Sequence, residues 1–192
     1  MELVAPKLYS AEEYLLLEEQ SFERNEFVNG EIIPMAGETP TANEVASNFI
    51  VFFKLSLKGK PFKAYGHDVK LMIGGGKTFR YPDMMVVNKE GVAKKWVTHP
   101  VLIVEVLSES TEKTDRDKKR VEYCSLPTTQ YYLIVHQDEP CVEVFRRNDK
   151  KWEFEFYTNL SDHIELPYFE IVISLNEIYE GIEFEQHTAT IA

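Results

Sequence analysis

The segment VLIVEVLSES, residues 101–110, decides the fold and raises the main functional question. Its apolar residues leave neither face for water, which is typical of a strand buried on both sides within a sheet. Glu105 lies in the middle of this run. An unpaired ionised carboxylate in such a place costs several kcal/mol or more, so Glu105 must lose its charge or find a cation.

A second acid follows the same pattern in RYPDMMVV, residues 80–87. Pro82 is expected to open a strand without removing a needed hydrogen bond, and Asp83 follows directly. If this strand pairs with the Glu105 strand so that both acids share a face and a level, two like charges come too close to be tolerated alone. A divalent cation resolves this conflict, because Mg²⁺ prefers one or two carboxylates and water. We therefore predict that Asp83 and Glu105 bind a metal.

Local signals place other elements around these two strands. Asn29-Gly30 between apolar runs predicts a type I′ hairpin, because this turn needs positive φ at both central residues. Residues 42–57 have the spacing of a core helix, and Thr114 is expected to cap a helix that ends before Pro127. Short capped helices are expected after Ser10 and Ser174. Strands are predicted within the segments 61–66, 68–87, 101–107, 130–136, 141–147 and 151–157.

This order of elements predicts an α/β fold, an α/β/α sandwich with a central mixed sheet. An N-terminal helix and hairpin and C-terminal antiparallel strands complete it. The length suits a single domain over residues 1–192. The helix after Thr114 would cross over from the Glu105 strand to the strand in 130–136, giving one right-handed parallel connection. Crevices at the carboxyl ends of such strands commonly hold ligands.

Composition narrows the cellular setting. No stretch approaches the roughly 18 to 20 apolar residues of a membrane span. The start of the chain lacks the basic and apolar regions of a secretory signal, so we expect a cytoplasmic protein. Cys124 and Cys141 form no CxxC pair, which argues against a zinc ribbon or a disulfide framework.

Charge is unevenly distributed along the chain. The net charge of −11 argues against indiscriminate nucleic-acid binding. Residues 54–147, however, hold 17 basic and 12 acidic residues, for a net charge of +5. A local basic surface and a merely solvated lysine-rich face both remain open. Residues 54–80 contain a single acid, Asp68, against seven basic residues. These are Lys54, Lys58, Lys60, Lys63, Lys70, Lys77 and Arg80.

These residues also resemble a known family. Pro82-Asp83 followed by Glu105 looks like the PD-(D/E)XK signature of restriction-endonuclease-like nucleases. Almost the whole chain, including FVNGEIIPMAG, YGHDVKLMI and DRDKKRVEY, is similar to the Uma-type endonucleases of that superfamily. The resemblance implies the restriction-endonuclease-like fold and a hydrolase that cleaves nucleic acid. We expect DNA as the substrate, although the sequence itself leaves DNA and RNA open. It also implies a Mg²⁺ or Mn²⁺ ion held by Asp83 and Glu105, and a lysine that helps to activate water.

The lysine departs from the general signature, because Leu107 occupies the position where the strand would supply it. In the Uma-type pattern the lysine comes from the following helix, and the match falls on Lys119, one helical turn from Tyr123. Helical spacing alone leaves Lys118 open as the second choice. The alternative is a basic, solvated helix face without catalysis.

Further ligands are less specific. Glu31 and Asp68 lie in segments that match the family, and Glu44 lies on the core helix, where an exposed acid is the simpler interpretation. The competing hypothesis for function is a catalytically weak or inactive nuclease fold that acts as a nucleic-acid or protein interaction module. A homodimer is expected, since two-fold assemblies are the commonest.

Overall fold

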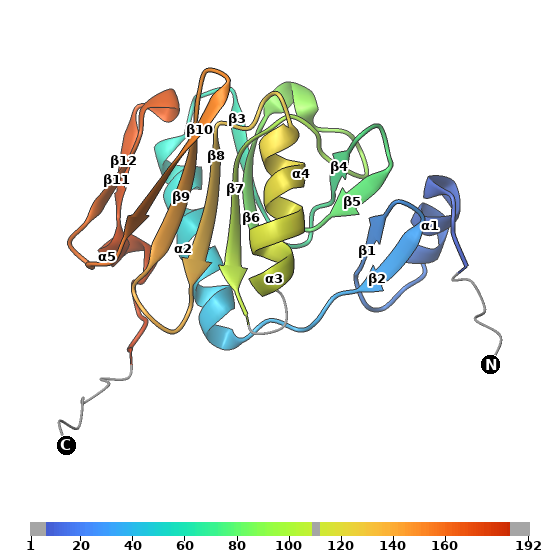
Figure 1. Cartoon of the computed structure of the whole chain (residues 1–192), viewed down its shortest axis with the longest axis horizontal. Coiled ribbons are helices and arrows are strands. Elements are labelled where there is room, and N and C mark those ends of the chain that lie inside the picture. Colours follow the sequence, from blue (N-terminus) through green and yellow to red (C-terminus); the bar gives the residue numbers. More distant parts are fainter. Residues whose placement is uncertain (1–6, 109–111, 185–192) are drawn as a thin grey trace.

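The computed structural model describes residues 7–108 and 112–184. Its centre is a six-stranded mixed sheet in the order β10-β9-β8-β7-β6-β3, with helices on both faces (Figure 1). The mixed α/β fold predicted from the sequence is therefore confirmed. The strands of this sheet are β3 Phe62–Gly66, β6 Met84–Asn88, β7 Pro100–Leu107, β8 Tyr131–His136, β9 Val142–Asn148 and β10 Lys151–Tyr157.

Strand β7 forms the middle of this sheet and is buried along its whole length, as its apolar run predicts. It pairs with β8 in parallel, with Glu105 opposite Ile134, whereas the other neighbouring pairs in the sheet are antiparallel. The connection between β7 and β8 contains α3 Glu112–Thr114, a π-helical turn η2 Asp115–Lys119, and α4 Arg120–Ser125. The predicted crossover is thus present.

Helix α2, Pro40–Ser56, packs on the opposite face of the sheet from α4. The Thr39 side chain caps it by accepting a hydrogen bond of 3.0 Å from the Ala42 N–H. Val45, Phe49 and Phe53 recur at helical spacing and are fully buried against the sheet. The helix therefore begins beside the lower end of β7 and ends near β3 in Figure 1.

A smaller sheet, in the order β2-β1-β5-β4, lies beside the central one (Figure 1). The predicted hairpin turn is confirmed, with φ of 50° at Asn29 and 97° at Gly30. Residues 68–87 differ from the expectation, because only β6 joins the central sheet. Phe79 of β5 packs instead with Tyr14 and Phe27. The elements are α1 Ala11–Glu18, β1 Asn25–Val28, β2 Glu31–Pro34, β4 Leu71–Ile73 and β5 Thr78–Arg80.

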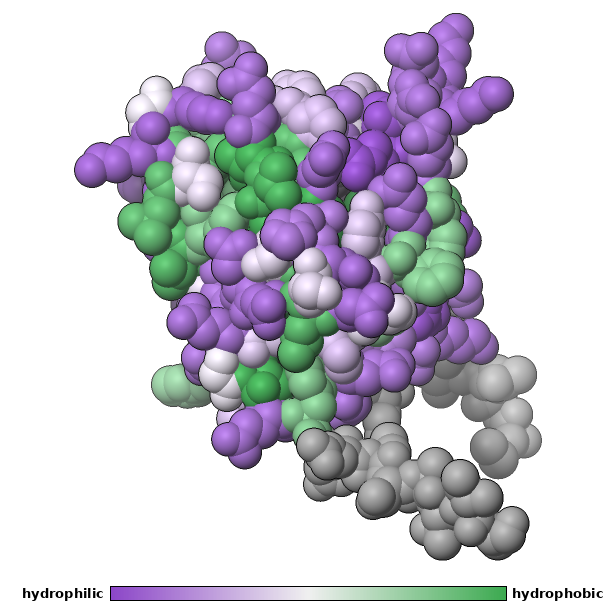
Figure 2. All heavy atoms as spheres, turned by 90° about the vertical axis from the view of Figure 1, so that its left-hand side faces the viewer, coloured by the Kyte–Doolittle hydropathy of each residue, from purple (hydrophilic) through white to green (hydrophobic). Residues whose placement is uncertain are grey.

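The C-terminal part closes the core over α2. It consists of the hairpin β11 His163–Leu166 and β12 Ile171–Ser174, the 3₁₀ turn η3 Pro167–Phe169 between them, and α5 Leu175–Ile178. A further 3₁₀ turn, η1 Lys89–Gly91, follows β6. Figure 2 shows this side of the molecule as mainly hydrophilic, with separate apolar groups between. In the described part of the chain, no helix is long and apolar enough to cross a membrane.

One helix start differs from the prediction. Thr114 has helical φ and ψ, and its side chain makes no capping hydrogen bond, because α3 has already begun at Glu112. Residues 109–111, which include the last two residues of the segment 101–110, lie outside the described residues. So do residues 1–6, which form part of the N-terminal stretch used to predict localisation.

Candidate active site

Asp83 and Glu105 are brought to the same end of the central sheet. Met84 pairs with Val104 across β6 and β7, so Asp83, just before β6, lies near the end of β7. Asp83 Oδ2 accepts a hydrogen bond of 2.6 Å from the Val106 N–H, which fixes this carboxylate against β7. Both acids line one cavity of about 280 Å³. Their predicted convergence is therefore present in the structure.

Lys119 reaches the same cavity from the π-helical turn. Its Nζ lies 3.1 Å from Glu105 Oε1, 2.9 Å from Asp115 Oδ1 and 3.9 Å from Glu26 Oε1. The Lys119 side chain is 8% exposed, so these ion pairs are shielded from solvent. The structure thus places one buried ammonium among several carboxylates.

The helical segment presents three polar side chains to the site at four-residue spacing. Asp115, Lys119 and Tyr123 face the sheet together, and the Tyr123 hydroxyl donates a hydrogen bond of 2.7 Å to Glu105 Oε1. Burial raises the pKa of Tyr123 well above its ordinary value, so this hydroxyl stays a donor. Single π-helical turns within helices are frequent at functional sites.

A buried ion network connects Lys119 to Arg80 through Glu26. The Arg80 guanidinium donates two hydrogen bonds of 2.8 Å to the Glu122 carboxylate and one of 2.5 Å to Glu26 Oε2. The Arg80 side chain is 2% exposed, so both partners are needed to offset its desolvation. Glu26 therefore links Arg80 to Lys119. Through these contacts the small sheet is joined to the helical segment that follows β7.

The cluster carries more negative than positive charge. Burial raises the pKa of Asp83 to about 7 and that of Glu105 well above its ordinary value, against the opposing attraction of Lys119. Burial alone would lower the pKa of Lys119, but the attraction of Glu105, Glu26 and Asp115 outweighs it and raises this pKa. Lys119 consequently remains an ammonium at neutral pH.

The raised pKa of Asp83 gives a testable pH dependence. The folded chain holds the Asp83 proton more tightly than the unfolded chain, so the free energy of unfolding is expected to fall as pH rises from about 4 to about 7 and then level off. Denaturant unfolding of metal-free wild type and Asp83→Asn over this range measures the contribution. The variant should show a flatter profile, and parallel profiles would contradict the assignment.

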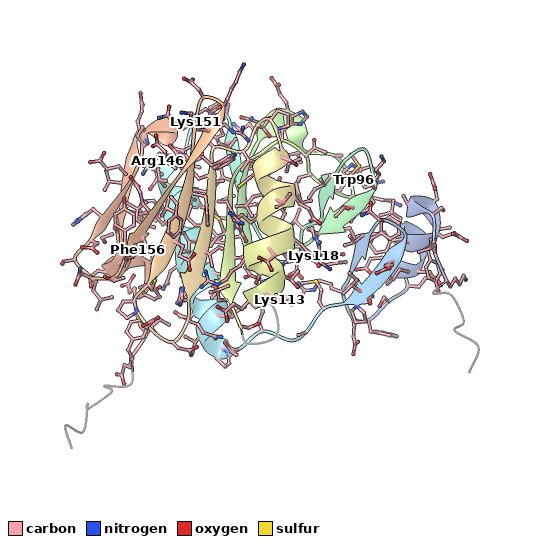
Figure 3. All side chains as sticks on the ribbon, in the orientation of Figure 1. Trp96, Lys113, Lys118, Arg146, Lys151 and Phe156 are labelled. Carbon is pink, nitrogen blue, oxygen red and sulfur yellow. The ribbon has the colours of Figure 1, made fainter. Side chains whose placement is uncertain are left out.

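The remaining sequence candidates lie outside the cavity lining. Glu31 and Glu44 are exposed on β2 and α2, and Asp68 is exposed and pairs with Arg24 at 2.7 Å. Lys118 is exposed on the surface of the helical segment (Figure 3). The structure therefore separates Lys118 from Lys119, which helical spacing alone did not.

Leu107, at the signature position, is buried in the core beneath α4 on the same face of β7 as Ile103. Glu105, two residues before it, shares this face, since side chains alternate along a strand. The Lys119 ammonium therefore reaches the face of the sheet from which a lysine at position 107 would project.

The donor set fits a hard divalent cation. Two carboxylates of raised pKa line the cavity, and a cation of charge +2 would relieve the surplus negative charge. Within residues 7–108 and 112–184, no group of three or more His, Cys, Asp or Glu side chains is arranged to hold a metal. Water and substrate oxygens would therefore complete the coordination of Mg²⁺ or Mn²⁺, as is usual for Mg²⁺.

Sequence reasoning missed Glu26, Asp115 and Arg80 as parts of the site. Asp115 could have been found from its four-residue spacing to Lys119 and Tyr123. Glu26 and Arg80 gave no comparable local signal, because they meet through the pairing of β1 with β5, 54 residues apart.

Comparisons with known proteins show which family the chain is similar to. A family model described as "Uma2: Putative restriction endonuclease" matches residues 11–176. Two uncharacterized proteins of Synechocystis sp. are similar to the chain. The protein sll1609 is 32% identical over 176 residues, covering 89% of this chain and 99% of that protein. The protein slr1290 is 31% identical over 182 residues, covering 93% and 95%.

A solved structure is also similar, described as a "putative nuclease belonging to DUF820" from Anabaena variabilis. The TM-score is 0.74 at 19% sequence identity, and the match covers 89% of this chain and 97% of the other. This likeness establishes a shared fold.

Proposed function

The chain belongs to the family described as "Uma2: Putative restriction endonuclease", and from this premise we propose that it is a metal-dependent endonuclease that hydrolyses phosphodiester bonds of DNA. The observation that carries the proposal is the meeting of Asp83, Glu105 and Lys119 at one cavity. The family and the nuclease-like fold support nuclease chemistry.

Each residue has a distinct proposed role. Asp83 and Glu105 would hold a Mg²⁺ or Mn²⁺ ion, which would polarise a phosphate and lower the pKa of a water. Lys119 keeps its proton on Nζ and so stabilises negative charge on a phosphate oxygen, rather than accepting a proton from water. Tyr123 orients Glu105 through its hydroxyl.

The competing function is an interaction module without catalysis, which the acidic ends of the chain and Leu107 in place of the strand lysine would favour. The buried ammonium of Lys119 weakens the argument from Leu107, because a lysine is present beside Glu105. An inactive module would bind DNA in a salt-dependent manner, or associate with itself, and would not cleave in the presence of metal.

The test is cleavage of plasmid and single-stranded DNA with Mg²⁺ or Mn²⁺, beside the same reactions with chelator. Wild type is expected to cleave only with metal, and Asp83→Ala is expected to lose cleavage, because one metal ligand is gone. Glu165→Ala, which removes an exposed acid of β11, is the matched control and should cleave like wild type.

Equal cleavage by wild type and Asp83→Ala would remove the proposed role of Asp83. DNA binding without cleavage by wild type would favour the interaction module. Light scattering on the same samples measures whether the chain forms the homodimer expected from its sequence.

A further inference from the structure

A second cavity, of about 370 Å³, is lined by lysines and lies away from the candidate active site. No carboxylate side chain is among its lining residues. We call this set the lysine cavity, after Lys54, Lys58, Lys60, Lys63 and Lys89. The whole chain has a net charge of −11, so five lysines around one cavity form a local concentration of positive charge.

The sequence left open whether the basic residues of the segment 54–80 form one surface, and the fold places only some of them together. Four of them gather at the lysine cavity, and the fold adds Lys89 from η1. Arg80 does not join them, because it is buried between Glu26 and Glu122. Lys70 lies over the ring of Tyr81, 5.5 Å from its centroid. The basic surface is thus localised at the end of α2.

Compensation of the α2 dipole explains only part of this cluster. Lysines near the C-terminus of a helix interact favourably with its dipole, which suits Lys54 and Lys58. Lys63 lies on β3 and Lys89 on η1, so this reason does not cover them. The Lys60 ammonium is held by a hydrogen bond to the Phe169 carbonyl.

The four other ammonium groups are exposed and free for a ligand. Among the residues that the structure describes, none of Lys54, Lys58, Lys63 and Lys89 forms an ion pair with an acid. Apolar walls that include Phe53 and Leu57 surround them. A cleft with one sign of charge and low-dielectric walls concentrates the field and attracts counter-ions.

We propose that the lysine cavity binds phosphate groups of the nucleic-acid backbone, outside the catalytic cavity. This inference rests on the proposed function for its choice of ligand. The two cavities lie at opposite ends of α2, because Thr39 lines the cavity of the candidate active site and Lys54 lines the lysine cavity. Figure 1 shows the course of α2 between these ends. At 1.5 Å per residue the backbones of Thr39 and Lys54 lie about 22 Å apart. A duplex must extend at least about six or seven base pairs from the scissile phosphate to reach both.

The test is the dependence of affinity on duplex length, measured by fluorescence anisotropy with hairpin duplexes of about 5 to 24 base pairs. Chelator in all samples prevents metal-dependent cleavage. Wild-type affinity is expected to rise once the duplex spans both cavities, and the variant Lys58→Glu/Lys63→Glu is expected to lose that rise. For the longest duplex, Kd should increase about tenfold or more, and the salt slope should decrease by about 2, since each phosphate contact contributes about 0.9.

The matched control is Lys150→Glu/Lys151→Glu, which makes the same charge change at the β9–β10 turn, where Figure 3 labels Lys151. Strands β10 and β3 are opposite edges of the central sheet, so the two lysine pairs are well separated. The control should keep the length dependence of wild type. The melting temperature of the control should match that of wild type, because both of its lysines are exposed. That of Lys58→Glu/Lys63→Glu should fall slightly, because Lys58 lies near the C-terminus of α2, but the variant should still melt as a folded protein.

Identical length dependence in wild type and Lys58→Glu/Lys63→Glu would overturn the lysine cavity as a phosphate site. Equal weakening by the control variant would also overturn it, because net charge alone would then explain the effect. If wild type fails to cleave with metal but the lysine variant still loses the affinity step, the proposed catalysis fails and the phosphate site stands.

Discussion

Replacing Glu105 with glutamine is expected to lower metal-dependent cleavage about a thousandfold without lowering the melting temperature of the metal-free protein. Loss of a metal ligand removes several kcal/mol of transition-state stabilisation, which corresponds to such a factor. Glutamine keeps the shape of the side chain and an oxygen that can accept from the Tyr123 hydroxyl. It also removes one negative charge from a cluster in which burial and neighbouring acids already raise the pKa of Glu105.

The same variant separates metal binding from folding. Mg²⁺ or Mn²⁺ should raise the melting temperature of wild type, because a ligand that binds only the folded chain stabilises it. It should leave that of Glu105→Gln nearly unchanged. Glu165→Gln, an exposed and charge-matched control, should respond like wild type. A large drop in the melting temperature of metal-free Glu105→Gln would show that this carboxylate supports the fold. It would contradict the view that the cluster around Lys119 carries a surplus of negative charge.

Replacing Lys119 with methionine is expected to reduce both cleavage and stability. Cleavage should fall about a hundredfold to a thousandfold, as is typical when one group that stabilises transition-state charge is removed. The free energy of unfolding at neutral pH should fall by about 3 to 5 kcal/mol, because Glu105, Asp115 and Glu26 lose their buried ammonium partner. Denaturant unfolding and the plasmid assay measure the two effects.

The neighbouring lysine provides the control. Lys118→Met makes the same chemical change at an exposed position, so both cleavage and stability should stay close to wild type. Lowering the pH should recover part of the stability lost in Lys119→Met, because protonated carboxyl groups no longer need the ammonium. If Lys118→Met abolished cleavage and Lys119→Met did not, the catalytic role would move to Lys118.

Much of this site was predictable because its signals are local. Glu105 in an apolar run and Asp83 directly after Pro82 are visible in the sequence, and strand pairing of the two runs brings them together. The Asn29-Gly30 turn was predictable for the same reason, since it depends on two adjacent residues.

The parts that were missed depend on contacts between distant segments. Arg80 appears in the sequence as one more basic residue, and only the pairing of β5 with β1 reveals it as a buried partner of Glu26. Lys119 was correctly preferred over Lys118 from the family pattern, but side-chain spacing alone did not separate the two, because the π-helical turn sets the rotation of the helix. Thr114 was predicted as a cap because the preceding turn of helix has no strong signal of its own.

The link from Arg80 through Glu26 to Lys119 bears on how far the protein can be truncated. The N-terminal helix and hairpin lie to one side of the central sheet in Figure 1 and look like an appendage suited to removal. A fragment starting after the hairpin would keep Asp83, Glu105 and Lys119, yet it would strip Arg80 of one of its two counter-charges. A fragment that keeps the candidate site intact must therefore retain β1, although β1 supplies neither of the proposed metal ligands.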